Sequence, residues 1–262
     1  MKKTALITGA SGGLGLSFAR VFAREGYDLV MVARSEDKLN KIKEDLEKDF
    51  GISATVIPAD LTLDSGAEDV YKRTLELGIS VDVLVNNAGF GDFGDFASSD
   101  LKKQCDMIAL NVTALVKLTH LYLQDMKARS SGKILNVDSI AAFQPGPLMS
   151  VYYATKAFVL SFSEALSVEL RGSGVSVTAL CPGPIDTGFE SRAELGESGL
   201  FKNLKVWSPE VIAEFGYRQM CRGRVVTVKG GVNRLIAFSS RLAPRALVRN
   251  TVYHIQKVKG SK

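Results

Sequence analysis

Cysteine and proline are scarce in this sequence, and long apolar runs are absent. The three cysteines (Cys105, Cys181 and Cys221) are far apart and odd in number, which excludes a disulfide framework and a CxxC metal site. No metal site is therefore predicted, and free thiols favour a reducing, cytoplasmic location. Seven prolines in 262 residues leave no proline-rich linker. Without a run of about 20 apolar residues, a membrane-spanning helix is not expected.

Acidic residues are missing from the C-terminal end of the chain. Residues 222–262 contain ten lysines and arginines and no aspartate or glutamate. The rest of the chain has the other 23 basic residues and all 28 acidic ones, so it carries a net charge of −5 while the whole chain carries +5. Composition alone does not explain this asymmetry.

Short apolar runs rich in β-branched residues alternate with helical patterns along the chain. A hydrophobic content of 46% and a charged content of 23% are typical of a soluble globular protein. The alternation predicts an α/β fold, in which a doubly wound parallel sheet of about seven strands has helices on both faces. Since no linker divides the chain, one Rossmann-type domain is expected over residues 1–262. The predicted strands are 4–8, 29–32, 53–57, 81–85, 133–137, 175–180 and 225–228, and helical patterns lie around 66–77, 99–129, 151–171 and 209–221.

A glycine-rich loop follows the first predicted strand. Gly9, Gly13 and Gly15 allow a tight turn, a close approach to a pyrophosphate, and close packing of a helix on the strand. Ser11 and Leu14 belong to the same loop and to the start of the next helix, whose free N–H groups favour phosphate. We therefore expect a dinucleotide site here. The alternative is a glycine-rich turn that binds no ligand.

Residues after the next three strands are further candidates for nucleotide binding. Asp60 and Leu61 follow the third strand, where a carboxylate can accept a hydrogen bond from an adenine amino group. Asn87 follows the fourth strand and is expected near the ribose. Arg34 follows the second strand, where an NAD-dependent enzyme usually has an acid. Because a guanidinium can bind a 2′-phosphate, NADP(H) is predicted over NAD(H); the alternative is that Arg34 is a solvated surface residue.

Three residues form a candidate catalytic set. Tyr152 and Lys156 are four residues apart in a predicted helix and share one face. An ammonium about 4 Å from the phenol would lower its pKa from about 10 to about 7, suitable for a general acid or base. Ser139 follows the fifth strand at the same sheet edge, where its hydroxyl can hydrogen-bond a substrate oxygen. The turn after the sixth strand can orient a nicotinamide, and its candidate residues are Pro182, Gly183, Ile185 and Thr187.

These motifs together resemble those of the short-chain dehydrogenase/reductase family. The resemblance implies hydride transfer between a nicotinamide cofactor and a carbonyl or secondary alcohol. In that family pattern Tyr152 is the general acid or base, and Lys156 lowers its pKa and binds the nicotinamide ribose. Ser139 steadies the carbonyl, and Asn111 holds a water in a proton relay. The matching residues are Thr8, Gly9, Gly13, Gly15, Asp60, Asn86, Asn87, Ala88, Gly89, Asn111, Ser139, Tyr152, Lys156, Pro182, Gly183 and Thr187.

Within the family, the chain is similar to a bacterial subgroup of general oxidoreductases, and its Ala33-Arg34-Ser35 run resembles that of NADP(H)-preferring members. One departure is Asp138, which stands where many members have a second serine. Since neighbouring residues in a strand point to opposite faces, Asp138 is a candidate buried carboxylate that leaves the role of Ser139 intact.

The segment 188–207 lies where the family has a substrate lid. Its glycines can act as hinges, and it is rich in large apolar residues. Such residues in loops favour a bulky apolar ketone or aldehyde as the substrate; the alternative is that they only pack the lid onto the body. The apolar candidates are Phe90, Phe93, Phe96, Phe143, Leu148 and Met149 in loops, and Phe189, Leu195, Leu200, Phe201, Leu204 and Trp207 in the lid.

The C-terminal extension, residues 230–262, is a basic amphipathic segment that Pro244 divides into two short helices. It can associate peripherally with an anionic membrane or attract an acyl carrier or a coenzyme A thioester. Alternatively, its apolar side covers the core or a subunit interface while its arginines are solvated. Specific nucleic-acid binding is not expected.

Two classes of function follow from these patterns. The complete Asn, Ser, Tyr and Lys set favours an NADP(H)-dependent enzyme acting on CH–OH and C=O groups. The alternative is a nucleotide-binding regulatory or scaffold protein of the same fold without turnover. The family resemblance also implies a homodimer or homotetramer that associates through the helices near 99–129 and 151–171.

Overall fold

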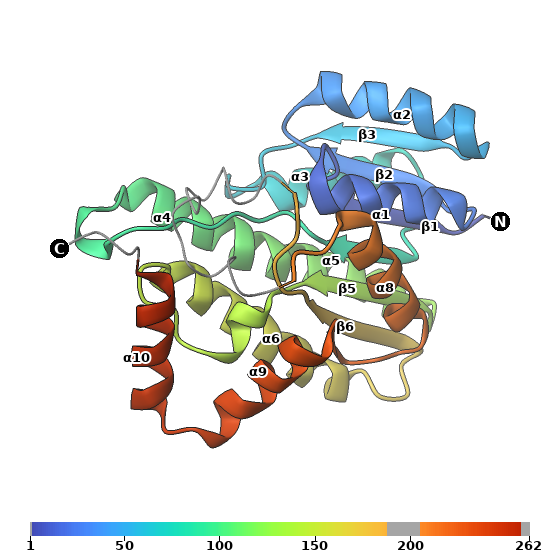
Figure 1. Cartoon of the computed structure of the whole chain (residues 1–262). Helices are drawn as coiled ribbons and strands as arrows, with labels where there is room; N and C mark the ends of the chain where they lie inside the picture. The colour runs from blue at the N-terminus through green and yellow to red at the C-terminus, as the bar shows by residue number, and fades with distance from the viewer. Residues whose placement is uncertain (1, 188–204, 258–262) are drawn as a thin grey trace.

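The computed structural model describes residues 2–187 and 205–257. Seven strands within them form one sheet in the order β3-β2-β1-β4-β5-β6-β7, and every neighbouring pair is parallel (Figure 1). The order reverses between β1 and β4, which is the position where doubly wound sheets bind ligands. The strands are β1 (Thr4–Thr8), β2 (Asp28–Ala33), β3 (Ala54–Pro58), β4 (Val83–Asn86), β5 (Gly132–Val137), β6 (Val175–Cys181) and β7 (Val226–Val228).

Helices connect the strands and cover both faces of the sheet. The connecting helices are α1 (Gly13–Arg24), α2 (Glu36–Phe50), α3 (Gly66–Glu76), α4 (Leu101–Ile108), α5 (Leu115–Ala128), α6 (Ser150–Glu169) and α8 (Pro209–Cys221). Short 3-10 turns occur at η1 (Phe96–Ser98) and η3 (Ile140–Phe143). The predicted doubly wound α/β fold with a seven-stranded parallel sheet is confirmed.

The alternation of side chains along each strand divides the core into two layers. Ala5 and Ile7 on β1 pack with residues of α1, α2 and α8, whereas Leu6 between them packs with residues of α3, α5 and α6. Both kinds of position are apolar because a parallel sheet is buried on both faces. This arrangement leaves the carboxyl ends of the strands as the edge where polar side chains can gather.

The helical pattern over 99–129 is interrupted. Residues Ala109–Ala114 form a π-helix, η2, between α4 and α5. Asn111 lies inside this wide turn and is 2% exposed. A π-helical turn holds one more residue than an α-helical turn, and such turns are frequent at functional sites. This one contains Asn111, a candidate catalytic residue from the sequence.

Two helices, α9 (Gly231–Leu242) and α10 (Arg245–Gln256), follow β7. Pro244 precedes α10 and separates the two, as its position in the sequence predicts. Figure 1 shows them as an angled pair near α6 and β6, on the far side of the molecule from α2 and β3. No helix in the described ranges has the length and apolar character that crossing a bilayer requires.

Candidate active site

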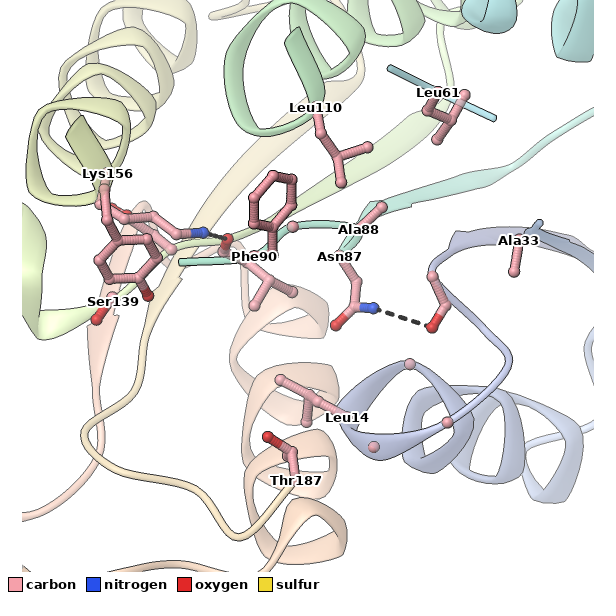
Figure 2. Close-up of a pocket in the computed structure, with 18 of the residues that line it drawn as sticks. Leu14, Ala33, Leu61, Asn87, Ala88, Phe90, Leu110, Ser139, Lys156 and Thr187 are labelled. Atoms are coloured by element: carbon pink, nitrogen blue, oxygen red, sulfur yellow. Dashed lines mark hydrogen bonds between the residues drawn. The ribbon is translucent and has the colours of Figure 1, made fainter. Parts of the chain in front are cut away.

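A cleft of about 1060 Å³ opens at the carboxyl ends of the strands. All predicted nucleotide-binding residues line it, together with Ser139, Tyr152 and Lys156. In Figure 2, Ser139 and Lys156 lie at one end and Ala33 and Leu61 at the other. We call these the Tyr152 end and the Arg34 end. The predicted lining residues brought together are Gly9, Ser11, Gly13, Leu14, Gly15, Arg34, Asp60, Leu61, Asn87, Ser139, Tyr152, Lys156, Pro182, Gly183, Ile185 and Thr187.

Thr8 and Asn87 join the ends of β1 and β4 at the point where the strand order reverses. The Thr8 hydroxyl oxygen accepts hydrogen bonds from the backbone N–H groups of Asn87 and Ala88, each at 2.9 Å. The Asn87 amide donates in return to the Thr8 carbonyl at 2.8 Å and to the Gly9 carbonyl at 3.5 Å; Figure 2 shows the second of these bonds. These bonds use the polar groups of Asn87 to fix the floor of the cleft.

The glycine-rich loop presents bare backbone to the cleft. Gly9 has a φ of +68°, which favours glycine, and a Cβ at Gly15 would overlap the Gly9 carbonyl oxygen. A Cβ at Gly12, in contrast, would meet nothing within 4 Å. Helix α1 begins at Gly13 and has no acidic residue in its first turn. No carboxylate there competes with an anion for the free N–H groups and the positive end of the helix dipole. The loop therefore fits the diphosphate of a dinucleotide.

The Arg34 end carries two cations. Arg34 and Lys38 are both exposed and both line the cleft. Among the described residues, neither has a salt-bridge partner. Lys38 was not predicted from the sequence, because a lysine in the exposed first turn of a helix gives no signal of its own.

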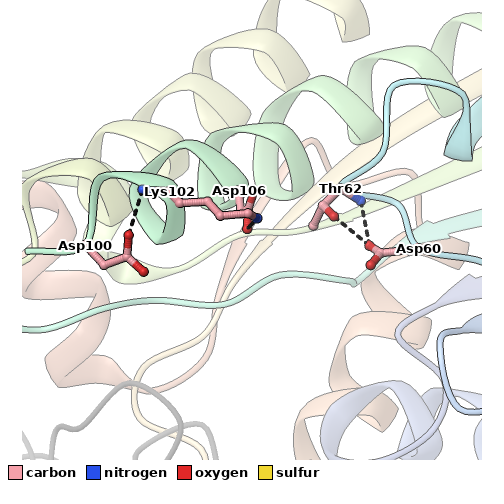
Figure 3. A network of polar contacts seen from close by, with 5 residues as sticks. All are labelled: Asp60, Thr62, Asp100, Lys102 and Asp106. Atoms are coloured by element: carbon pink, nitrogen blue, oxygen red, sulfur yellow. Dashed lines mark hydrogen bonds and ion pairs between the residues drawn. The ribbon is translucent and has the colours of Figure 1, made fainter.

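Asp60 lines the same end of the cleft as these cations. One of its oxygens, Oδ1, accepts hydrogen bonds from the Thr62 backbone N–H at 3.0 Å and the Thr62 hydroxyl at 2.7 Å (Figure 3). Partial burial acts to raise the pKa of Asp60, but the bonds from Thr62 and the charge of Arg34 outweigh it and lower the pKa. The carboxylate is therefore ionised and held in place.

Lys102 forms part of the rim beside Asp60. Its ammonium lies 2.6 Å from Asp106, and its backbone N–H donates to Asp100, which caps α4 (Figure 3). This pairing compensates the charge of Lys102 locally, so Arg34 and Lys38 supply the positive potential of this end.

At the Tyr152 end, Ser139 and Lys156 are each held by the backbone. The Ser139 hydroxyl oxygen accepts from the Ala141 N–H at 3.1 Å and also hydrogen-bonds the hydroxyl of Tyr152. The Lys156 ammonium donates to the Val137 carbonyl at 2.9 Å (Figure 2) and lies 5.8 Å from the centre of the Tyr152 ring. The sequence therefore correctly predicted that these three residues meet.

The expected lowering of the Tyr152 pKa is not found. Burial of the hydroxyl raises the pKa above its usual value, the hydrogen bond with Ser139 lowers it less, and the nearby Asp138 carboxylate raises it further. The expectation rested on the positive charges of Lys156 and of an oxidised nicotinamide, and it left out both burial and Asp138. The phenol consequently stays protonated at neutral pH, which is the form that donates a proton.

Asp138 is buried, as its position next to Ser139 predicted. It is 3% exposed; its Oδ2 lies 3.6 Å from the Cys181 sulfur, and its Oδ1 has no hydrogen-bond partner in the described structure. Burial raises the pKa of Asp138 to about 7, although Lys156 acts to lower it. Burial also lowers the pKa of Lys156, while Asp138 opposes that shift. The two groups share one buried electrostatic environment behind the Tyr152 end.

Asn111 lies behind the cleft and is not among the residues that line it. Its amide donates to the Phe90 carbonyl at 2.9 Å and accepts from the Phe90 N–H at 3.1 Å. A third bond, at 3.2 Å, goes to the Thr155 hydroxyl. The side chain thus fixes the loop after β4 against α6. Its part in a proton relay stays a prediction.

The substrate side is formed partly by loops and partly by α10. Phe90 and Met149 line the cleft as predicted, whereas Phe96 is 58% exposed. Val252 of α10 packs in one cluster with Met149 and Tyr153, and Gln256 donates to the Tyr153 hydroxyl at 2.7 Å. Most of the predicted lid, 188–204, lies outside the described residues; Trp207 pairs with Ile185 beside the cleft.

A family model described as short chain dehydrogenase matches residues 3–197. The chain belongs to the short-chain dehydrogenase family. Mouse (Mus musculus) 17-beta-hydroxysteroid dehydrogenase type 3 is 40% identical over 192 residues, which cover 71% of this chain and 61% of the mouse protein. Mouse very-long-chain 3-oxoacyl-CoA reductase is 34% identical over 243 residues, 88% of this chain and 75% of the relative. The chain thus spans less than two thirds of the first of these relatives.

Two solved structures resemble this chain over 92% or more of its length. A short-chain dehydrogenase from Sphingobium yanoikuyae in complex with NADPH has a TM-score of 0.82 and 30% identity, with 99% of this chain and 98% of that chain covered. A bulky-bulky ketone specific alcohol dehydrogenase from Comamonas testosteroni has a TM-score of 0.78 and 30% identity, with 92% of each chain covered.

Proposed function

We propose that this short-chain dehydrogenase is an NADP(H)-dependent carbonyl reductase for a bulky apolar ketone or aldehyde. The observation that carries the proposal is the arrangement of one cleft. It has a protonated phenol at Tyr152, hydrogen-bonded to Ser139, at one end and the cations Arg34 and Lys38 at the other. The NADPH complex of the Sphingobium relative supports the choice of cofactor.

Residues along the cleft can hold each part of NADP(H). The loop from Gly9 to Gly15 binds the diphosphate, and Arg34 and Lys38 bind the 2′-phosphate. Asp60 accepts a hydrogen bond from the adenine, while the turn at Pro182 to Thr187 orients the nicotinamide. Once bound, the reduced nicotinamide supplies the hydride.

The side chains at the Tyr152 end supply the proton and hold the substrate. Tyr152 donates its phenolic proton to the carbonyl oxygen as negative charge develops there. Ser139 hydrogen-bonds the same oxygen, which places it within reach of the phenol. Lys156 positions the ribose and stabilises the phenolate that remains. Because the phenol is protonated at neutral pH, Tyr152 is in the form that can donate a proton to a carbonyl oxygen.

Apolar side chains beside the phenol support a bulky apolar substrate. Phe90, Leu110 and Met149 line the cleft, and Val252 stands behind Met149. The similarity to proteins named for a 17-beta-hydroxysteroid, a very-long-chain 3-oxoacyl-CoA and a bulky-bulky ketone agrees with this choice. We also propose that residues 1–262 form one domain, that 188–207 is a substrate lid, and that the protein acts in the cytoplasm as a homodimer or homotetramer.

The test of this function is NADPH oxidation measured against ketones, aldehydes and 3-oxoacyl thioesters of increasing apolar bulk. Turnover with kcat/KM rising with apolar size is expected. Tight NADPH binding with no turnover on the whole panel would instead support the alternative of a regulatory or scaffold protein.

Removing the cations of the Arg34 end should change cofactor preference. In the Arg34→Ala/Lys38→Ala variant, kcat/KM for NADPH should fall by at least about 100-fold while that for NADH changes little, because each charge-assisted bond to the 2′-phosphate contributes about 1.5–3 kcal/mol. Lys41→Ala, on the same helix but not lining the cleft, is the matched control. An equal loss with both cofactors would contradict 2′-phosphate binding.

A further inference from the structure

Helix α9 packs on the protein through an amide and a small side chain. Asn233 is 5% exposed and Ala237 is 7% exposed, and they lie one turn apart on the face toward η3 and the turn after β6. The Asn233 amide donates to the Lys229 carbonyl at 2.8 Å, and a Cβ at Gly183 would overlap this amide. The inward face of α9 is therefore narrow, partly polar and closely fitted.

The large apolar residues of α9 point the other way. Leu235, Phe238 and Leu242, which we call the α9 stripe, are 65%, 60% and 73% exposed. Their spacing of three and four residues places them along one line of the helix, and Leu235 lies two positions from Asn233, on the opposite side. Contiguous apolar side chains of this size at the surface mark a site of contact with a membrane or with another protein.

The surroundings of the α9 stripe are basic. Arg234 on α9 and Arg245 and Arg249 on α10 are exposed, and no aspartate or glutamate occurs from residue 222 to the end of the chain. A second copy of this chain would be a poor occupant. In a two-fold contact the same patch meets itself, so these arginines would face one another with no carboxylate on either helix to pair with.

We propose that the α9 stripe docks on the surface of an anionic phospholipid membrane. The three apolar side chains enter the boundary between headgroups and acyl chains, and the flanking arginines contact lipid phosphates. An arginine can keep its stem along the apolar surface while its guanidinium reaches the headgroups. Apolar burial and charge attraction act together, so binding requires both an apolar interior and negative charge.

Helix α10, which follows α9, connects the proposed docking surface with the cleft. Val252 on the inward face of α10 packs with Met149 and Tyr153 next to the Tyr152 end. Helices α9 and α10 form one angled pair (Figure 1), so docking through α9 would place α10, which packs beside the Tyr152 end, close to the lipid. This relation to the substrate site rests on the proposed function, whereas the docking itself does not.

Flotation of the full-length protein with lipid vesicles tests the proposal. The protein is mixed with vesicles of phosphatidylcholine alone or of phosphatidylcholine with phosphatidylglycerol. The stripe variant is Leu235→Ser/Phe238→Ser/Leu242→Ser, and the charge variant is Arg245→Gln/Arg249→Gln. The matched control, Leu75→Ser/Leu77→Ser/Leu101→Ser, removes three exposed leucines from the acidic part of the chain. NADPH affinity and the unfolding midpoint verify that each variant is folded.

We expect binding to phosphatidylglycerol vesicles only, and weaker binding at high salt. The stripe variant should bind at least about tenfold more weakly, the charge variant should also weaken, and the control should match the wild type. Equal binding by the stripe variant, or no binding of the wild type to anionic vesicles, would overturn the proposal. If the wild type does not bind vesicles, two other partners of the α9 stripe can be distinguished. A stripe variant that forms a smaller oligomer than the wild type would show that a second copy of the chain covers the stripe. Binding of a purified acyl carrier protein that is lost in the stripe variant would show that an acidic protein covers it. Failure of docking with normal ketone reduction would leave the proposed function standing.

Discussion

Helices α1 and α9 are both amphipathic, yet they turn opposite faces to the protein. On α1, Phe18 and Phe22 are fully buried against the sheet. On α9 the corresponding apolar residues, the α9 stripe, are mostly exposed, and Asn233 is buried instead. Hydrophobic periodicity therefore predicts an amphipathic helix but not which of its faces meets the rest of the chain.

The cause lies in what each helix packs against. Helix α1 covers the apolar side chains of β1 and its neighbours, so the hydrophobic effect turns its apolar face inward. Helix α9 lies on η3 and the turn after β6, where close backbone leaves room for an amide and an alanine rather than for leucines. Substitutions on the two kinds of helix face should therefore differ in their effects.

The largest effect is expected in the glycine-rich loop at the start of α1. Gly15→Ala should reduce NADPH affinity roughly 100-fold, because the added methyl overlaps the backbone of Gly9 and no side-chain rotation can relieve the clash. Gly231→Ala, at the start of α9 and outside the cleft, where the methyl meets nothing within 4 Å, should bind NADPH like the wild type. Isothermal titration calorimetry measures both affinities. If the two variants bind equally well, close packing of α1 on β1 does not form the site.

The next effect concerns the buried carboxylate behind Tyr152. The pKa of Asp138 rises from about 4 in the unfolded chain to about 7 in the folded protein. Between about pH 4 and pH 7, Asp138 is therefore protonated in the native state but ionised in the unfolded chain. The stabilisation that results is fully present below about pH 4 and is lost as the pH rises through 7. Asparagine does not titrate, so the stability of the Asp138→Asn variant should not fall with pH for this reason.

Urea unfolding at several pH values measures the effect of Asp138. Between pH 5 and 8, the free energy of unfolding of Asp138→Asn should rise relative to the wild type by roughly 2–3 kcal/mol, less any cost of leaving Lys156 without its neighbouring carboxylate. Asp49→Asn, on the exposed surface of α2, is the control and should show no such trend. A constant difference between Asp138→Asn and wild type across the range would contradict the raised pKa.

The smallest effect compares the two sides of α10. Val252→Ala removes two methyl groups from the cluster with Met149 and Tyr153 and should destabilise the protein by about 1–2 kcal/mol. Leu247→Ala removes a side chain that is 60% exposed and should change stability by less than about 0.5 kcal/mol. Thermal unfolding distinguishes them. Equal destabilisation would mean that α10 does not pack through its Val252 side.

The sequence predicted the sheet because each strand is a short apolar run with a turn at its end. All seven predicted strands occur, with bounds that differ by no more than two residues. The candidate residues meet for the same reason: in a parallel sheet, whatever follows a strand gathers at one edge. Local pattern and fold topology together therefore suffice for most of the site.

What the sequence could not predict depends on contacts between distant segments. The pKa of Tyr152 follows from burial and from Asp138, which no spacing rule measures. The bond from Gln256 to Tyr153 joins residues 103 positions apart, and the outward turn of the α9 stripe follows from the shape of the turn beneath it. Lys38 was missed for a different reason, because a lysine on an exposed helix gives no signal until the cleft is seen.

The most direct test of the proposed function is single-turnover reduction by the Tyr152→Phe variant with NADPH already bound. Loss of the proton donor should lower the rate of hydride transfer by about 10²–10⁴-fold, while NADPH affinity stays that of the wild type. Tyr153→Phe, one position along α6 and bonded to Gln256 rather than to Ser139, should keep its rate. Turnover by Tyr152→Phe at the wild-type rate would contradict the assignment of Tyr152 as the proton donor.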